Sequence, residues 1–384
     1  MKILFVCQYY APEPFRHPDM CEELVRRGHE VTVVTGTPNY PMGVTYDDYK
    51  HGAHRDEVLN GVKVHRCRTI ARRNNAFFRL LNYYSFVISS RLYVKKLRGD
   101  FDLVFVHQLS PVIMAEAGID YARKHKIPLF LYCLDIWPES MVIGNIKKSS
   151  PIFKYFRFAS ERIYKAADKL LISSQGFAEY FEKEFGITDT IYLPQYAESI
   201  FTPEACRKEP DGFIDLMFAG NIGKAQSIDT IIEAARLTQD IKNLRWHIVG
   251  EGSELARIKA LASSLPQVIF HGRKPLDEMP AYYAKADAML ITMKATKNLS
   301  RTIPGKVQTY LAAGKPILGA IDGETRRYIE ETKSGLIAPA QDAPDLAEKV
   351  REYVRIKESG GEIEVNSEAF DWYKLFEKIL AQEP

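Results

Sequence analysis

Residues 300–318 read SRTIPGKVQTYLAAGKPIL and place Lys306 in a Pro-Gly turn at the start of a predicted apolar helix. The unpaired backbone N–H groups and the dipole of a helix start favour a bound anion, and an ammonium group beside them adds positive charge. The sequence therefore predicts a phosphate site formed by Arg301, Thr302, Ile303, Pro304, Gly305 and Lys306. An ordinary Pro-Gly turn with a solvated lysine would look the same, so the rest of the chain must decide between the two.

Further glycine turns follow predicted strands in the same half of the chain. They contain Gly220, Asn221, Gly223 and Lys224; then Gly250, Glu251 and Gly252; then Gly272, Arg273 and Lys274. Because the carboxyl ends of parallel strands meet at one edge of a sheet, we expect these turns to converge with Lys306 on one ligand. The segment GNIGKA lacks the spacing of a P-loop, and the first strand–turn, FVCQYYAPEP, lacks a dinucleotide fingerprint. We also find no Asp-x-Asp motif that would chelate a divalent ion on a diphosphate. We therefore expect lysines and a helix start, rather than a metal ion, to neutralise a diphosphate there.

Candidate catalytic groups in the first half are His107 and Asp135, which lie at the ends of predicted strands. A carboxylate at that position could receive the proton of an acceptor hydroxyl, or it could cap the following turn. His107 could equally be a buried histidine that ends a strand. Glu139 could be a charge at a helix start.

The chain has 384 residues, more than one hydrophobic core usually supports, and its 46% hydrophobic and 26% charged residues are typical of a soluble globular protein. Its apolar runs are too short to span a bilayer and the N-terminus lacks the features of a signal peptide, so we expect a cytosolic protein. The five cysteines are odd in number and widely spaced, which argues against a disulfide framework and against a zinc site.

Short β-branched runs alternate with helical stretches in both halves of the chain. The predicted strands are at residues 2–6, 30–35, 62–67, 102–108, 128–133 and 169–174, and then at 214–220, 244–250, 268–272, 288–292, 316–320 and 335–339. This alternation predicts an α/β fold with two Rossmann-like, doubly wound domains. We place the domains at residues 1–200 and 201–365, with a linker near residues 201–211.

Motifs along nearly the whole chain resemble one family. They are QYYAPEP, CEELVRRGHEVTVVTGTPNYPMG, DLVFVHQLSP, LDIWPES, LPQYAESIF, FAGNIGKAQSIDTIIEAA, HIVGEGSE, FHGRKPLDEMPAYYAKADAMLI and TIPGKVQTYLAAGKPIL. The sequence resembles the GT-B glycosyltransferases of family 4, and most of all the bacterial branch that contains N-acetylfucosaminyltransferases of surface-polysaccharide assembly. The resemblance implies an acceptor-binding first domain facing a nucleotide-sugar-binding second domain across a cleft, with a C-terminal helix in residues 366–384 that crosses back to the first domain.

The resemblance also implies a reaction. A sugar would move from a nucleotide diphosphate donor, expected to be a UDP-sugar, with retention of configuration and with no metal or other cofactor. Lys224 and Lys306 would face the diphosphate, Arg273 and Lys274 would lie by the nucleobase, and residues 250–252 would form the floor of the pocket. His107 would face the donor sugar. The expected acceptor-side residues are Pro14, Phe15, Arg16, Asn39 and Glu139.

The sequence departs from the family pattern at several positions. Arg301 and Thr309 stand where much of the family carries a Glu-x7-Glu pair. Asn221 and Gln226 replace a usual Arg and a usual Lys, and Phe15-Arg16 replaces the glycine-rich turn after the first strand. We interpret these changes as altered donor recognition, with inactivity as the alternative.

Residues 58–99 contain no acidic side chain, while Arg and Lys alternate with aromatic residues. A solvated basic face is the ordinary explanation, and the formal net charge of only +3 without a nucleic-acid-binding motif argues against nucleic acid as a partner. For an enzyme of this family branch, the acceptor would be a polyprenyl-diphosphate-linked sugar or another saccharide at the inner face of the cell membrane. We expect residues 77–93 to form a helix that contacts an anionic membrane surface from the cytoplasm.

Two other functions fit the same fold, namely a GT-B sugar-nucleotide epimerase and a non-catalytic binding subunit. An epimerase should need several carboxylates or histidines for proton shuttling, and the sequence offers few. Release of nucleoside diphosphate when an acceptor is added would distinguish a glycosyltransferase from both.

Overall fold

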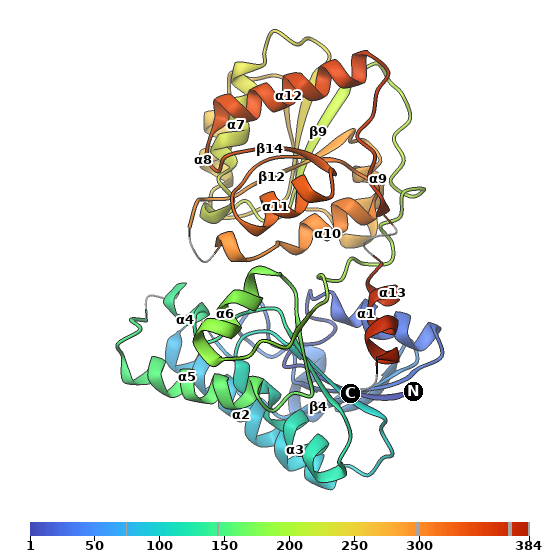
Figure 1. Cartoon of the computed structure of the whole chain (residues 1–384), viewed down its shortest axis with the longest axis vertical. Helices are drawn as coiled ribbons and strands as arrows, with labels where there is room; N and C mark the ends of the chain where they lie inside the picture. Colours follow the sequence, from blue (N-terminus) through green and yellow to red (C-terminus); the bar gives the residue numbers. More distant parts are fainter. Residues whose placement is uncertain (74, 144–145, 297–298, 368–370, 383–384) are drawn as a thin grey trace. The chain divides into compact units, whose positions relative to one another are not determined.

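The computed structural model describes residues 1–384 except 74, 144–145, 297–298, 368–370 and 383–384. The chain forms two compact units, one of Met1–Leu193 with Lys378–Pro384 and one of Pro194–Glu377 (Figure 1). The division falls between Leu193 and Pro194, ahead of the boundary placed after residue 200 from the sequence. The last helix, α13 (Trp372–Ala381), contains the point at which the chain passes from the second unit to the first.

The first unit contains an eight-stranded sheet with the order β3-β4-β2-β1-β5-β6-β7-β8. All neighbouring strands are parallel except β3 and β4, and the central strand β1 pairs Val6 with Val34 of β2 and with Val106 of β5. The strands are β1 (Lys2–Val6), β2 (Glu30–Gly36), β3 (Asp56–Leu59), β4 (Val62–Cys67), β5 (Leu103–Gln108), β6 (Leu129–Cys133), β7 (Lys169–Ile172) and β8 (Thr190–Tyr192). The helices are α1 (His17–Arg26), η1 (Asp47–Gly52), α2 (Ala76–Lys96), η2 (Val112–Ala115), α3 (Glu116–His125), α4 (Ser140–Ile143), α5 (Pro151–Tyr164) and α6 (Gly176–Phe185).

The second unit contains a six-stranded parallel sheet with the order β11-β10-β9-β12-β13-β14. The strands are β9 (Ile214–Ala219), β10 (Leu244–Val249), β11 (Val268–Gly272), β12 (Ala288–Thr292), β13 (Ile317–Ala320) and β14 (Gly335–Ala338). The helices are η3 (Lys224–Gln226), α7 (Ile228–Leu237), α8 (Leu255–Leu261), η4 (Leu276–Glu278), α9 (Met279–Tyr283), η5 (Leu299–Arg301), α10 (Gly305–Ala312), α11 (Glu324–Glu331) and α12 (Ala343–Glu358). Both sheets confirm the predicted doubly wound α/β fold. The sequence prediction missed β3 and β8, which are only four and three residues long.

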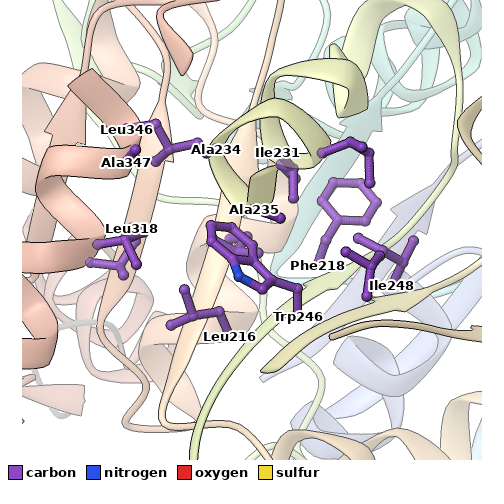
Figure 2. Packing of buried hydrophobic residues seen from close by; sticks show 14 of the residues in the cluster. Leu216, Phe218, Ile231, Ala234, Ala235, Trp246, Ile248, Leu318, Leu346 and Ala347 are labelled. Atoms are coloured by element: carbon purple, nitrogen blue, oxygen red, sulfur yellow. The ribbon is translucent and has the colours of Figure 1, made fainter. Parts of the chain in front are cut away.

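Alternating residues of β9 explain why both faces of the second sheet are covered. Leu216 and Phe218 pack with α7, α8 and α12 on one face, while Met217 and Ala219 pack with α9, α10 and α11 on the other. The largest fully buried side chain is that of Trp246 in β10, which lies on the α7 side (Figure 2). A strand that is apolar on both faces is the pattern expected of a parallel sheet between two helical layers.

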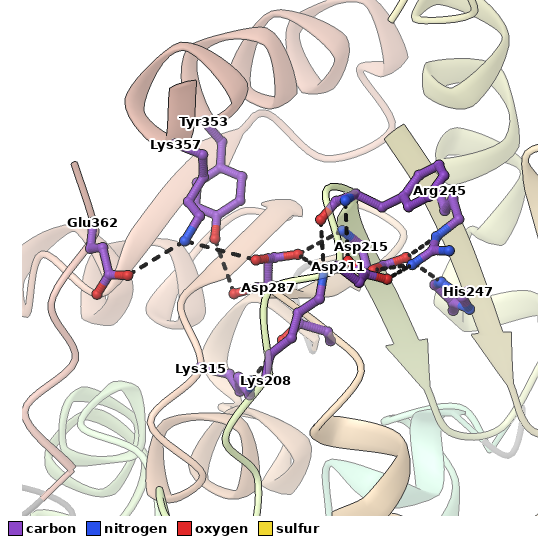
Figure 3. A network of polar contacts seen from close by, with 12 residues as sticks. Lys208, Asp211, Asp215, Arg245, His247, Asp287, Lys315, Tyr353, Lys357 and Glu362 are labelled. Atoms are coloured by element: carbon purple, nitrogen blue, oxygen red, sulfur yellow. Dashed lines mark hydrogen bonds and ion pairs between the residues drawn. The ribbon is translucent and has the colours of Figure 1, made fainter. Parts of the chain in front are cut away.

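A buried network of charges joins the amino ends of the strands in the second unit (Figure 3). Asp215, near the start of β9, accepts hydrogen bonds from Lys208 Nζ at 2.6 Å and from Arg245 Nε at 2.6 Å, and its Oδ1 lies 2.7 Å from His247 Nε2. Lys208 also donates to Asp287, just before β12, at 2.5 Å. Burial alone would raise the pKa of Asp215, but the hydrogen bonds from His247, Arg245 and Lys208 hold it well below its ordinary value. The network therefore fixes the end of the sheet where the strands begin.

We expect Asp215→Asn to lower the free energy of unfolding of the second unit by up to about 3 kcal/mol, because it removes the buried carboxylate that Lys208 and Arg245 share, although both cations keep Asp211 and Lys208 also keeps Asp287. The matched control is Asp240→Asn, which breaks an exposed ion pair with Arg351 and should cost less than about 1 kcal/mol. Urea unfolding can be followed by tryptophan fluorescence in a Trp137→Phe background, since the other two tryptophans lie in the second unit. Equal effects of the two substitutions would contradict a structural role for the network.

The contribution of Asp215 to the stability of the second unit depends on pH in a defined direction. Because the folded pKa of Asp215 lies below the ordinary 3.8, its stabilisation is present above that pH and is lost as the pH falls below it. The difference in stability between the parent and Asp215→Asn should therefore shrink only under such acidic conditions.

Candidate active site

In the second unit, the strand order reverses direction between β9 and β12. The chain runs from β9 to β10 and β11 on one side, and then returns to β12 on the other side of β9. The loops that follow β9 and β12 therefore leave the same edge of the sheet in opposite directions, and ligands of open α/β sheets bind at such points. Two hydrogen bonds join these loops: Thr292 Oγ1 donates to the Gln226 carbonyl at 2.6 Å, and Lys294 N donates to the Ala225 carbonyl at 3.0 Å.

The predicted glycine turns pack against each other at this edge. Gly220 N donates to the Val249 carbonyl and Gly250 N donates to the Gly272 carbonyl, both at 2.9 Å. A Cβ atom on Gly250 would lie 1.9 Å from the Gly220 carbonyl oxygen, and one on Gly252 would lie 2.3 Å from the Ile222 carbonyl oxygen. Gly250 also has a φ of 138°, which other residues rarely adopt. Only residues without a side chain allow the turns to approach this closely.

Lys306 lies against the first of these turns. It is the second residue of α10, whose N-cap, Pro304, makes no side-chain cap. Lys306 Nζ donates to Gln226 Oε1 at 3.0 Å, lies 4.1 Å from the centre of the Phe218 ring, and would be 2.8 Å from a Cβ on Gly220. The structure thus brings together the lysine, a helix start and the Gly220 turn, as the sequence analysis expected.

The remaining predicted donor-side residues surround this centre more loosely. The side chains of Asn221, Lys224, Glu251 and Arg273 are exposed. Lys274 Nζ lies 5.2 Å from the centre of the Tyr282 ring. Main-chain carbonyls shape the segment before α10: that of Ile303 accepts from Gln195 Nε2 at 2.9 Å, and that of Thr302 accepts from Thr325 Oγ1 at 3.1 Å. Arg301 ends η5 and is half-buried, and Gly223 is the N-cap of η3.

One carboxylate near α10 was missed by the sequence analysis. Glu198 is buried, and its Oε2 lies 3.4 Å from the hydroxyl of Thr309. Thr309 follows Lys306 by three residues, so both side chains lie on one face of α10. Glu198 comes from a segment more than a hundred residues earlier. Nothing in the sequence around Glu198 indicates that it lies beside Thr309. Glu198 nevertheless places a carboxylate near α10, where the Glu-x7-Glu pair expected from the resemblance is absent.

The first unit has the same kind of divergence between β1 and β5. His107 of β5 is buried, with its ring centre 4.4 Å from that of His17, 5.8 Å from that of Phe5 and 5.6 Å from that of Tyr132. Its Nδ1 has no hydrogen-bond partner among the described residues. Burial, and then the neighbouring His17, lower the pKa of His107 well below its ordinary value. The imidazole is therefore neutral at neutral pH.

A second missed carboxylate, Glu13, organises the loops beside β1. It is buried and accepts hydrogen bonds from the backbone N–H groups of Tyr10, Asn39 and Tyr40 at 3.1, 2.8 and 2.7 Å. Burial raises the pKa of Glu13 to about 7 despite these three donors. The predicted acceptor-side residue Asn39 is thereby fixed, and its Oδ1 accepts from Arg72 N at 3.1 Å.

The other predicted acceptor-side residues lie in the same loop. Pro14 is exposed, and the Phe15 ring stacks on Tyr9 with centres 5.3 Å apart. Arg16 is the N-cap of α1 but makes no side-chain cap. An aromatic residue therefore packs where the resemblance leads one to expect a glycine-rich turn.

Asp135 and Glu139 both have structural partners. The two carboxylate oxygens of Asp135 accept from the hydroxyls of Ser110 and Ser140, so this residue ties the loop after β5 to the start of α4. Glu139 is buried and accepts from Lys148 Nζ at 2.7 Å. These contacts agree with the capping alternative for Asp135 and leave its catalytic role a prediction.

Among the described residues, no three His, Cys, Asp or Glu side chains gather in a way that could hold a metal ion. The chain does contain one Asp-x-Asp sequence, outside the glycine turns, but its carboxylates at Asp100 and Asp102 contact Lys2. All five cysteines are buried and unpaired.

Comparisons with known proteins follow the division of the chain. Residues 17–192 match the family described as "Glycosyl transferase 4-like domain", and residues 214–355 match "Glycosyl transferases group 1". The chain is 27% identical over 289 residues to the probable glycosyltransferase WbjE of Pseudomonas aeruginosa, covering 70% of each chain. It is 25% identical over 340 residues, 82% of each chain, to the putative colanic acid biosynthesis glycosyl transferase WcaI of Escherichia coli (strain K12). The crystal structure of Anabaena Alr3699/HepE in complex with UDP and glucose aligns with a TM-score of 0.65 at 15% identity, covering 99% of this chain and 98% of that one, which shows a shared fold.

Proposed function

We propose that this chain, which belongs to the GT-B glycosyltransferases through a glycosyl transferase 4-like domain and a group 1 domain, moves a sugar from a UDP-sugar to a lipid-linked or saccharide acceptor. Transfer would retain the anomeric configuration and need no metal. The name of the WcaI relative supports polysaccharide biosynthesis as the setting, and the complex of HepE with UDP supports a uridine nucleotide. The resemblance to N-acetylfucosaminyltransferases supports an N-acetylated deoxyhexosamine as the transferred sugar.

The position of Lys306 is the observation that carries this proposal. Its ammonium lies against the Gly220 turn, beside the start of α10 and at the point where the strand order reverses. A diphosphate at this point would meet backbone N–H groups, a helix dipole and an ammonium without any metal ion. As the reaction proceeds, negative charge grows on the departing nucleotide, and fixed positive charge there stabilises the transition state.

In the first unit, we assign His107 to the donor sugar and Asp135 to the acceptor hydroxyl. A neutral imidazole can form a hydrogen bond to a sugar without adding charge, which suits the low pKa of His107. The contacts of Asp135 with two serine hydroxyls make it the weaker of the two assignments.

We further propose that the first unit contacts the inner face of the cell membrane. No described helix is long and apolar enough to cross a bilayer. Ile88 and Leu92 of α2 and Phe158 of α5 are nevertheless exposed, and the hydroxyls of Tyr84 and Tyr155 lie 3.2 Å apart between the same two helices. Exposed apolar side chains flanked by basic residues are typical of a helix that lies in a membrane interface.

The donor site predicts the effect of removing one ammonium group. Lys306→Ala should weaken UDP binding by about 1.5–3 kcal/mol, which is the range for a hydrogen bond to a charged group. Calorimetric titration with UDP measures this directly. The matched control is Lys242→Ala. Lys242 is exposed and precedes β10, at the end of that strand opposite to the Gly250 turn, so its loss should leave the affinity unchanged. Unchanged affinity in Lys306→Ala would remove this residue from the donor site.

The role of His107 can be separated from its packing. His107→Phe keeps an aromatic ring in the cluster but removes both nitrogens, so turnover should fall about a hundredfold or more while the melting temperature changes little. A panel of sugar nucleotides is first screened with the parent for UDP release when acceptor is added. The turnover of each variant is then measured as UDP release from the sugar nucleotides that the parent consumes. His17→Phe, in the adjacent ring, is the control. If both variants lost turnover equally, His107 would be a packing residue.

Membrane contact predicts a charge-dependent binding to vesicles. Replacing Arg79, Lys95 and Lys96 by Gln should weaken the free energy of binding to phosphatidylglycerol vesicles, measured by sedimentation, by about 3 kcal/mol. Each cation near such a surface contributes about 1 kcal/mol. Arg91 is left in place because it is ion-paired with Asp120. A control that replaces Lys242, Lys333 and Arg355 in the second unit removes the same charge and should bind normally. Equal binding by both variants would reject this surface.

A further inference from the structure

A cavity of about 810 Å³ lies at the carboxyl ends of β2 and β4 in the first unit. Residues from the loop that contains η1 and from the segment after β4 form its walls, and the backbone N–H of Thr37 donates to the Cys67 carbonyl at 3.1 Å where the two strands end. We call it the basic cavity because its lining includes Lys50, Arg55, Arg66, Arg68 and Arg73. Arg66, Arg68 and Arg73 belong to the acid-free stretch at residues 58–99 but precede α2, and they line this cavity.

The positive charges of this cavity are poorly compensated. The one carboxylate in the lining is Asp47, which is exposed and lies 2.6 Å from Lys50 Nζ. Within the part of the chain that the structure describes, Arg55, Arg68 and Arg73 form no ion pair. Several like charges around one space repel each other, so the cavity favours a ligand that carries more than one negative charge.

Arg66 differs from the others because it is buried. Its Nε, at 3.0 Å, and its Nη2 both donate to Glu57 Oε1, and its guanidinium carbon lies 4.7 Å from the centre of the Tyr49 ring. Its Nη1 has no hydrogen-bond partner among the described residues. A buried donor without a partner is costly, and Tyr49 belongs to η1, in which no residue is buried. A ligand oxygen that displaced the Tyr49 ring would give this nitrogen its missing acceptor.

We propose that the basic cavity binds a diphosphate, and that this diphosphate belongs to the acceptor substrate. The cations are mainly arginines, whose planar forks match the geometry of phosphate oxygens. A volume of about 810 Å³ exceeds that of a diphosphate and leaves room for an attached sugar. The assignment to a diphosphate rests on the cavity alone, whereas the assignment to the acceptor rests on the proposed function.

The first experiment is a calorimetric titration with inorganic pyrophosphate in metal-free buffer, with saturating UDP present to occupy the donor side. The double variant Arg55→Gln/Arg68→Gln should raise the dissociation constant at least tenfold. The control Lys242→Gln/Lys333→Gln removes the same charge from exposed positions outside the cavity and should bind pyrophosphate normally. Undiminished binding by the cavity variant would overturn the diphosphate site. If the parent failed to bind UDP, the proposed function would fail while this titration still tested the cavity.

The source of the diphosphate is tested with two more probes on the same variants. Geranyl diphosphate, a water-soluble prenyl diphosphate, should lose affinity for the cavity variant as pyrophosphate does, while phosphatidylglycerol vesicles should bind the cavity variant and the control alike. If the cavity variant instead lost only vesicle binding, the cavity would hold a lipid headgroup and the acceptor assignment would be wrong.

Discussion

The close backbone contact between the turns after β9 and β10 determines the geometry of the second unit's site. The Gly220 carbonyl oxygen lies 1.9 Å from the place where a Cβ on Gly250 would be, so these turns can meet only where residue 250 has no side chain. Gly220 in turn leaves open the space that the Lys306 ammonium reaches. The two glycines thus determine where a positive charge stands at this edge of the sheet, and the residues of α10 are arranged around that position.

Most of the fold could be predicted because each central strand is a continuous apolar run that needs burial on both faces. Such a run is visible in the sequence whatever its partners are. The strands β3 and β8 lack this signal, since β3 begins with Asp56 and Glu57 and β8 has only three residues. β3 pairs antiparallel with β4 alone, so long-range pairing and not local pattern makes it a strand.

The site could be predicted to the extent that its residues follow strands. The glycine turns have that property, and parallel strands carry them to one edge, whereas Lys306 is indicated by the Pro-Gly turn that begins α10. Glu198, Glu13 and the basic cavity do not, because each depends on segments that are distant in sequence. Arg66, for example, stands within a strand, and only the fold brings Tyr49 over its guanidinium group. A basic stretch in the sequence cannot show which of its cations lie on a helix surface and which surround a cavity.

Different contacts hold the charged side chains at the two ends of the second sheet. At the amino ends, the buried carboxylate of Asp215 contacts Lys208, Arg245 and His247, so two partly buried cations compensate its charge. At the carboxyl ends, two contacts of Lys306 are with an amide oxygen and an aromatic ring, neither of which carries a net charge. Gln226 orients the ammonium without cancelling it. A lysine in place of Gln226 would repel Lys306 at the same distance, so a neutral amide at this position suits an anion site that contains the Lys306 ammonium.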